Sequence, residues 1–533
     1  MTKRVLFGIA AILCIGFALR LYQLTADLPY VDLGSSGAFL LDEGVYQASA
    51  AHKVLFGSWQ MPGIVYYGWT VRAYNLWLYP FFKIFGVTLF AARLSCMSAF
   101  MLGLGILMMG LRRYVAPMVL LVFGLLSATN YLLVMWSKMP LPYTVVLLPV
   151  SGLLLTTVFA IARKSVLYAA LAGFFAFLCV SVKEPALLFF PISAAAIMFG
   201  FRIYHGARVR DMLLNKVLWT YIASFVILFA LYQVYYLAPV ANEWWNDSAQ
   251  QARIVANDAV KGLTSPALQS GRQHYGALSA LEKFFLKFLG MKYIAWVWVL
   301  AFLSLGLIAI GRKQIVAQLK NNVGSLVSLY MFLWAVIMIP GLVITRMRGG
   351  LAIHWSPLYL TPIIYFAALG FYQLWHYTKG AQWLKVTRGI ALVLLLGAVT
   401  TDLNQYHHWL KQLPEYSKIN EVADQIADAV QVDNASPTIL MFDAPIVALR
   451  HPEVNVIALR DFQAKFISNV YPEWKPQYVV VQEAALRPQN SEAVVKTIRD
   501  QGFTLKSIGS YPVGVFDGSD VSLTLYKLKK KTL

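Results

Sequence analysis

The chain has 533 residues, of which 59% are hydrophobic and only 13% are charged. Because a soluble globular domain carries about 25% charged residues, this composition excludes an ordinary soluble protein and indicates that lipid is the main solvent. The formal net charge is +20, but the lysines and arginines lie mostly in short connectors between apolar runs, a pattern typical of membrane topology rather than of nucleic-acid binding.

Apolar runs of near-bilayer length recur from the N-terminus onwards and predict about eleven transmembrane helices. The first run is too long for a signal-peptide core and has no small-residue cleavage site after it, so we expect a retained helix. The predicted spans are Val5–Leu24, Ser95–Leu111, Pro117–Met135, Leu141–Ala162, Val166–Val182, Ala186–Phe201, Leu218–Leu237, Tyr293–Gly311, Leu326–Ile344, Trp355–Trp375 and Ile390–Thr401.

The charged connectors predict the orientation of these spans. Basic pairs such as Arg112–Arg113 and Arg163–Lys164 fall on one side, which the positive-inside rule assigns to the cytoplasm together with the N-terminus. The other side receives the loops 26–94 and 238–292 and the C-terminal tail. We therefore expect a multi-pass protein of the cell inner membrane with an extracytoplasmic C-terminus.

Two regions are predicted, a transmembrane domain over 1–402 and an extracytoplasmic domain over 403–533. In the second, strand-like runs alternate with helix-like runs, which favours a small α/β domain. The strand-like runs are Thr438–Phe442, Val454–Leu459, Tyr478–Val481 and Val521–Tyr526, and the helix-like runs are Tyr416–Val430 and Glu492–Asp500.

Adjacent carboxylates, Asp42 and Glu43, stand out in the first external loop. A carboxylate beside apolar segments needs a partner or a task, and removing a proton from a hydroxyl or an amine is a natural task. The alternative is structural, since Asp42 could cap a helix that begins at Glu43.

The segment Leu41-Asp42-Glu43-Gly44-Val45-Tyr46 resembles the first-loop signature of GT-C glycosyltransferases. More narrowly, the chain resembles the bacterial group of protein-mannosyltransferase-like, aminoarabinose-transferase-like and RgtA/B/C/D-like enzymes. The segments 85–95 and Trp136-Ser137-Lys138 are similar to that group's sequences before the second helix and after the third.

This resemblance implies transfer of one sugar from a polyprenyl-phosphate carrier to an acceptor on the extracytoplasmic face. The implied base is Asp42, with Glu43 orienting it or helping to hold a substrate. Deprotonation of the acceptor and attack on the anomeric carbon would expel the lipid phosphate in one inverting step. The acceptor could be lipopolysaccharide, another cell-envelope glycan, a protein or another lipid.

A leaving phosphate requires positive charge where charge accumulates in the transition state. The candidate cations at the external boundary are Lys138, Lys183, Arg346, Arg348 and His354. Arg346 and Arg348 suit phosphate because a guanidinium binds two oxygens, although both could be interfacial anchors. Lys183 could instead pair with Glu184.

Further contacts to sugar or acceptor could come from Tyr46, Glu243, Trp244 and Asp247, of which the last three could equally anchor the 238–292 loop at the interface. The sequence after Lys138 lacks the acidic residue that related enzymes often carry there. We expect no obligatory cofactor, and a divalent metal is possible but has no support in the ligand spacing.

Two other functions remain open. A transporter or flippase of lipid-linked sugars would place ionisable residues near the bilayer midplane, often in repeated halves. A membrane ligase of lipid-linked glycans would also have an external site. Only the resemblance favours the monosaccharide transferase over the ligase.

Overall fold

The computed structural model describes residues 3–25, 46–59, 72–237, 296–297, 299–303, 322–345, 356–376, 381–412, 418–431, 437–442, 454–459, 464, 467–484, 488–516 and 519–531. The chain divides into two units. The first comprises Met1–Tyr22, Met97–Ser137 and Tyr143–His407, and the second comprises Gln23–Cys96, Lys138–Pro142 and His408–Leu533.

Long apolar helices make up the first unit and confirm a polytopic membrane protein. Within the described residues, seven helices are long and apolar enough to cross a bilayer, or eight if the bent pair α7 and α8 is one span. The helices of this region are α1 Lys3–Leu21, α6 Leu89–Leu111, α7 Pro117–Thr129, α8 Tyr131–Lys138, α9 Pro142–Val145, α10 Leu147–Arg163, α11 Val166–Val182, η2 Glu184–Leu188, α12 Phe189–His205, α13 Val209–Leu213, α14 Lys216–Tyr232, η3 Gln233–Leu237, α19 Val323–Thr345, α20 Ser356–Trp375 and α21 Ala381–Gln412.

Several of these helices differ from the predicted spans. The expected span Pro117–Met135 is two helices, bent by 58° between Thr129 and Tyr131. The expected span Ile390–Thr401 is the apolar middle of α21, which continues as a helix into polar sequence at both ends. The expected span Tyr293–Gly311 lies largely outside the described residues.

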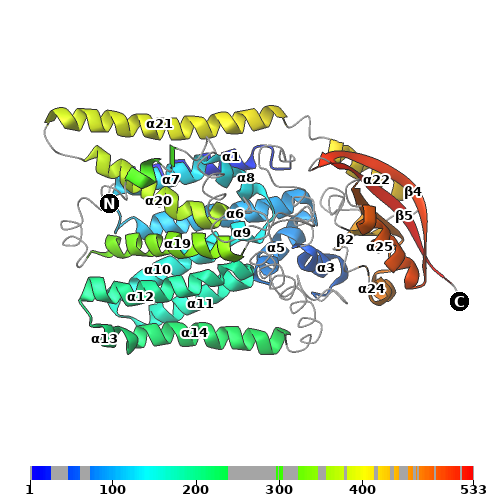
Figure 1. Ribbon diagram of the computed structural model, residues 1–533, viewed down its shortest axis with the longest axis horizontal. Helices are drawn as coiled ribbons and strands as arrows, with labels where there is room; N and C mark the ends of the chain where they lie inside the picture. Colours follow the sequence, from blue (N-terminus) through cyan, green and yellow to red (C-terminus); the bar gives the residue numbers. More distant parts are fainter. Residues whose placement is uncertain are drawn as a thin grey trace, which may run out of the picture. The chain divides into compact units, whose positions relative to one another are not determined.

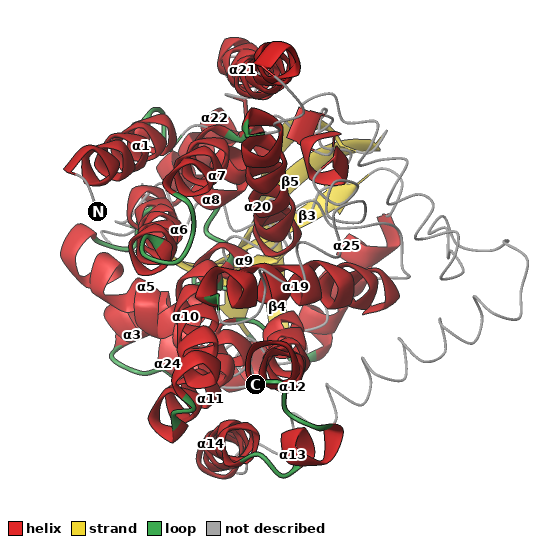
Figure 2. Cartoon of the chain, turned by 90° about the vertical axis from the view of Figure 1, so that its left-hand side faces the viewer, coloured by secondary structure: helices red, strands yellow, loops and turns green. Residues whose placement is uncertain are grey.

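The helices of the first unit pack side by side (Figures 1 and 2). α11 contacts α10 and α14, α19 contacts α12 and α20, and α7 contacts α1 and α20. At Gly173, a Cβ atom would lie 2.6 Å from the carbonyl oxygen of Tyr221, so α11 and α14 approach more closely than a larger residue would allow. Small residues permit such close contacts between membrane helices, where dispersion forces drive association.

The first loop contributes two helices to the second unit, α3 Ala48–Phe56 and α5 Arg72–Phe85. Gly57 ends α3 with a φ of 78° and donates its N–H to the carbonyl of Lys53. A glycine tolerates this left-handed conformation without a steric penalty. The buried residues of α5 are Tyr74, Asn75, Leu78 and Phe82, which share one face of the helix.

The C-terminal residues form a five-stranded sheet with the order β2-β1-β3-β5-β4. The first three strands are parallel, and β5 is antiparallel to β3 and β4. The elements are α22 Lys418–Gln431, β1 Thr438–Phe442, β2 Asn455–Leu459, α24 Ile467–Trp474, β3 Tyr478–Ala484, α25 Pro488–Asp500, β4 Phe503–Phe516 and β5 Ser519–Lys530. The predicted α/β fold is therefore confirmed.

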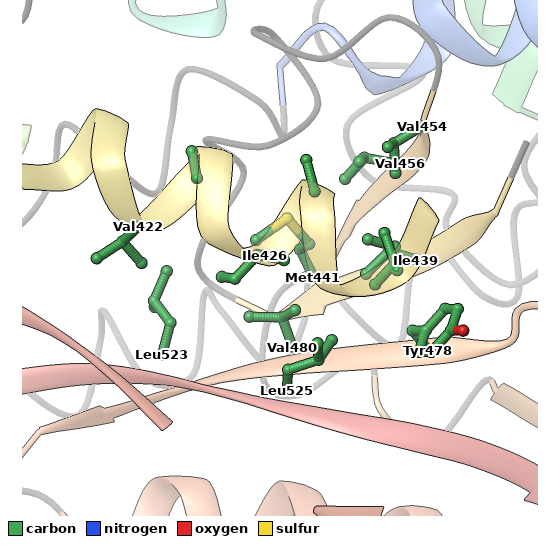
Figure 3. Close-up of a cluster of buried hydrophobic side chains, with 13 residues drawn as sticks. Val422, Ile426, Ile439, Met441, Val454, Val456, Tyr478, Val480, Leu523 and Leu525 are labelled. Carbon is green, nitrogen blue, oxygen red and sulfur yellow. The ribbon is translucent and has the colours of Figure 1, made fainter. Parts of the chain in front are cut away.

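The sheet has a hydrophobic core on each face because side chains alternate along its strands. Ile439 and Met441 of β1 pack with α22 (Figure 3). Leu440 and Phe442, the alternate residues, pack with α24 and α25. The sequence did not predict β4, whose two register shifts adjoin Gly509 and Gly514 and interrupt the regular pattern of a strand.

Candidate active site

Only three of the predicted site residues lie in the described part of the chain: Tyr46, Lys138 and Lys183. The others lie outside the described residues. They are Asp42, Glu43, Glu243, Trp244, Asp247, Arg346, Arg348 and His354.

The chain that follows the carboxylate pair is held by Asn75 of α5, a fully buried residue. Its Nδ2 donates to the carbonyl of Tyr46 at 3.0 Å, and its Oδ1 accepts from the N–H of Ala50 at 2.9 Å. The first N–H groups of a helix have no partner within the helix, and Gln47, the N-cap of α3, provides no side-chain cap. Asn75 supplies that cap from another helix and fixes the start of α3.

The turn after Lys138 is joined to the same segment. The carbonyl of Pro140 accepts from the hydroxyl of Tyr74 at 2.7 Å and from Nε2 of Gln47 at 3.4 Å. Lys138, two residues before Pro140, is only 1% exposed. Tyr46, Lys138 and Pro140 thus belong to one unit, in which hydrogen bonds join the N-terminal ends of α3 and α5 to the turn after Lys138.

Lys183 lies in the first unit, between α11 and η2, in an extended conformation. Its Nζ is 2.6 Å from Oε2 of Glu184 and 5.8 Å from the centre of the Tyr143 ring. The lysine side chain is 7% exposed and that of Glu184 is 39% exposed. The ion pair that the sequence allowed is present, and the aromatic face adds a second favourable contact for the ammonium group.

Two buried charged residues were missed in the sequence, Arg20 in α1 and Asp402 in α21. Both are fully buried, and both contact the break between α7 and α8. The signal that could have identified Arg20 is its position inside the apolar run Val5–Leu24, where a charge is costly and marks a function or a partner. Asp402 directly follows the apolar run Ile390–Thr401.

His52 of α3 contacts the C-terminal sheet domain within the second unit. Its Nδ1 is 2.6 Å from the carbonyl of Ser58, and its Nε2 accepts from the indole N–H of Trp474 at 2.7 Å. A neutral imidazole with its proton on Nδ1 satisfies both bonds. His52 and Trp474 are each 3% exposed, so the hydrogen bond is shielded from water.

The described residues contain no group of three or more histidine, cysteine, aspartate or glutamate side chains that could hold a metal ion. Asp42, Glu43 and His354 are outside this part of the chain.

No protein-family model and no curated protein sequence matches the chain. Solved structures do match. One is the aminoarabinose transferase ArnT from Cupriavidus metallidurans bound to undecaprenyl phosphate, at 13% identity and a TM-score of 0.51, over 98% of this chain and 98% of that one. Another is the oligosaccharyltransferase AglB from Archaeoglobus fulgidus in complex with an inhibitory peptide and a dolichol-phosphate, at 12% identity and a TM-score of 0.51, over 96% of this chain and 74% of that one. Both have the GT-C fold, which is therefore the fold of this chain.

Proposed function

From the GT-C fold of this chain, we propose that it is a membrane glycosyltransferase that uses a polyprenyl-phosphate-linked donor. The observation that carries this proposal is the fold shared with ArnT over 98% of both chains, in a structure that contains undecaprenyl phosphate. A lipid-borne donor suits a protein whose helices lie in the bilayer. We propose the extracytoplasmic face of the inner membrane as the place of transfer.

The proposed reaction transfers a single sugar with inversion, with Asp42 as the base and Glu43 as its orienting partner. Asp42 takes the proton from the acceptor nucleophile, whose oxygen or nitrogen attacks the anomeric carbon while the bond to the lipid phosphate breaks. Tyr46 supports this assignment because its carbonyl is fixed by Asn75. Asp42 precedes Tyr46 by four positions, so covalent geometry keeps it within about 14 Å of that anchor.

The expelled phosphate carries negative charge that needs fixed cations. We assign this task to Lys138, Lys183, Arg346, Arg348 and His354. Burial supports the two lysines, since at 1% and 6% exposure an ammonium group attracts a phosphate more strongly than it would in water. Glu243, Trp244, Asp247 and Tyr46 remain candidates for contacts to sugar or acceptor.

The test is sugar transfer by the purified protein in liposomes with a polyprenyl-phosphate monosaccharide and candidate acceptors. We expect Asp42→Asn to reduce the transfer rate by roughly a hundredfold or more, the usual contribution of a general base. Asp428→Asn is the matched control, because Asp428 is an exposed carboxylate on α22 of the C-terminal domain.

Near-normal transfer by Asp42→Asn would remove the proposed base. Transfer only from polyprenyl-pyrophosphate oligosaccharides would assign the protein to the ligases. Uptake of lipid-linked sugar into vesicles without transfer would make it a transporter.

A further inference from the structure

The break between α7 and α8 leaves backbone groups without helical partners in the interior of the first unit. The two helices meet at 58° around Asn130, which has extended dihedral angles (φ −55°, ψ 121°). Nearly every residue from Val119 to Lys138 is buried. Because apolar surroundings offer no water to the free groups at such a break, each needs a partner from the protein.

On the α8 side, the partners are acceptors. The side chain of Asn130 accepts from the N–H of Leu133 at 3.2 Å, as an N-cap does. Oδ1 of Asp402 accepts from the N–H of Tyr131 at 3.0 Å, and both carboxylate oxygens accept from Nδ2 of Asn130, at 3.3 and 3.4 Å. A carboxylate also interacts favourably with the positive end of the helix dipole.

On the α7 side, the partner is a cation. The guanidinium of Arg20 donates to the carbonyls of Ala128 and Ser127, at 2.8 and 3.2 Å. These carbonyls belong to the last turn of α7, at the negative end of its dipole. Arg20 also donates from Nε to the hydroxyl of Ser137 at 2.6 Å, so one side chain joins the end of α7 to the last turn of α8.

We propose that Arg20 and Asp402 are positioning residues that set the direction of α8 and thereby the place of Lys138. A straight apolar helix would need neither charge, and two fully buried charges are costly to retain for stability alone. Arg20 donates a hydrogen bond to Ser137, the residue that immediately precedes Lys138 in the sequence. This inference rests on the proposed function, in which Lys138 binds the donor phosphate.

The first test is kinetic and uses Ser137→Ala, which keeps both charges and removes the link from Arg20 to α8 together with the hydrogen bond from Ser137 to the carbonyl of Val134 in the same helix. We expect the KM for the polyprenyl-phosphate donor to rise roughly tenfold, the scale of one charge-assisted hydrogen bond, and the KM for the acceptor to stay unchanged. A loss of folded protein would lower the apparent kcat and leave both KM values as they were. Ser224→Ala is the control, since its hydroxyl joins α14 to the carbonyl of Ala170 in α11, away from the break.

The second test asks whether the effect passes through Lys138. In a Lys138→Met background, Ser137→Ala should cause no further rise in donor KM, because the group it positions is gone. An equal rise in both backgrounds, or a donor KM that Ser137→Ala leaves unchanged, would overturn the inference.

The third test is structural and does not depend on activity. Cryo-electron microscopy of Asp402→Asn should show a changed angle between α7 and α8. The same change is expected in Arg20→Lys, because an ammonium group cannot make the same set of hydrogen bonds as a guanidinium. Thr400→Val, also on α21, should keep the 58° bend. An unchanged bend in both charge variants would contradict the positioning role.

Absence of transfer by the wild-type protein from every polyprenyl-phosphate sugar would instead refute the proposed function. The angle between α7 and α8 in the charge variants would still show whether Arg20 and Asp402 orient α8.

Discussion

At the scale of single residues, the structure shows how the buried cation Lys183 is held at the end of α11. It has an ion pair with Glu184 and the Tyr143 ring beside it. This ion pair is consistent with two different roles for Lys183. The lysine could neutralise Glu184, or Glu184 could hold the lysine in place for a phosphate.

Variants that remove the charge of Lys183, of Glu184 or of both distinguish between these two roles. If Lys183 binds the donor phosphate, Lys183→Gln raises the donor KM about tenfold or more, and the Lys183→Gln/Glu184→Gln double variant remains equally impaired. If Lys183 serves only to neutralise Glu184, the double variant recovers, because no unpaired carboxylate is left. The measurement is the donor KM of the three proteins, and Glu184→Gln alone is the control for the carboxylate. Recovery by the double variant would remove Lys183 from the phosphate site.

At the scale of elements, the contact between α11 and α14 depends on Gly173. A side chain there would meet the backbone of α14, which cannot move out of the way as a flexible side chain can. Other apolar residues of these two helices, among them Leu167 and Ile227, are exposed on the surface of the protein.

We therefore expect Gly173→Ala to lower the thermal stability of the detergent-solubilised protein, by about 1–3 kcal/mol in unfolding free energy, the usual cost of overpacking. Gly389→Ala is the matched control, because a Cβ atom on that residue of α21 meets nothing within 4 Å and alanine favours the helix. The comparison is made by thermal unfolding of both variants. Equal stability of the two proteins would show that α11 and α14 can separate without cost.

At the scale of the whole molecule, one of the two units contains both the first loop and the C-terminal domain, which lie far apart in the sequence. The loop helices α3 and α5 belong to the same unit as the C-terminal sheet, and the His52–Trp474 hydrogen bond joins them. Asp42 and Glu43 precede α3 in the sequence, so we expect the C-terminal domain to influence the proposed base through that helix.

Trp474→Phe tests this coupling. The phenyl ring keeps most of the buried apolar surface but loses the N–H, leaving Nε2 of His52 without its donor from Trp474 at a cost of about 1–3 kcal/mol. We expect faster proteolysis of the 46–59 segment and a lower rate of sugar transfer. Trp219→Phe is the control, since it also removes an indole hydrogen bond, here to the carbonyl of Leu213, but in the first unit. Identical proteolysis patterns for the wild type and Trp474→Phe would show that the His52–Trp474 hydrogen bond does not stabilise the 46–59 segment.

The sequence by itself determined the membrane-spanning class, the α/β nature of the C-terminal domain and the GT-C resemblance, because these depend on local composition, periodicity and short motifs. The match of α11 to its predicted span and of β1 to its predicted strand illustrates this. The roles of Asp42 and Glu43 stay predictions.

Only the tertiary structure decided how the backbone is satisfied where regular helices stop. The break at Asn130 lies inside a long apolar run, where the polar residues Ser127, Thr129 and Asn130 are the local sign of it. Its partners come from 108 and 271 positions away in the chain, through Arg20 and Asp402. The same holds for Asn75, whose cap on α3 spans 25 positions. Hydrogen bonds over such separations depend on which helices pack together, and the local sequence pattern does not specify which helices those are.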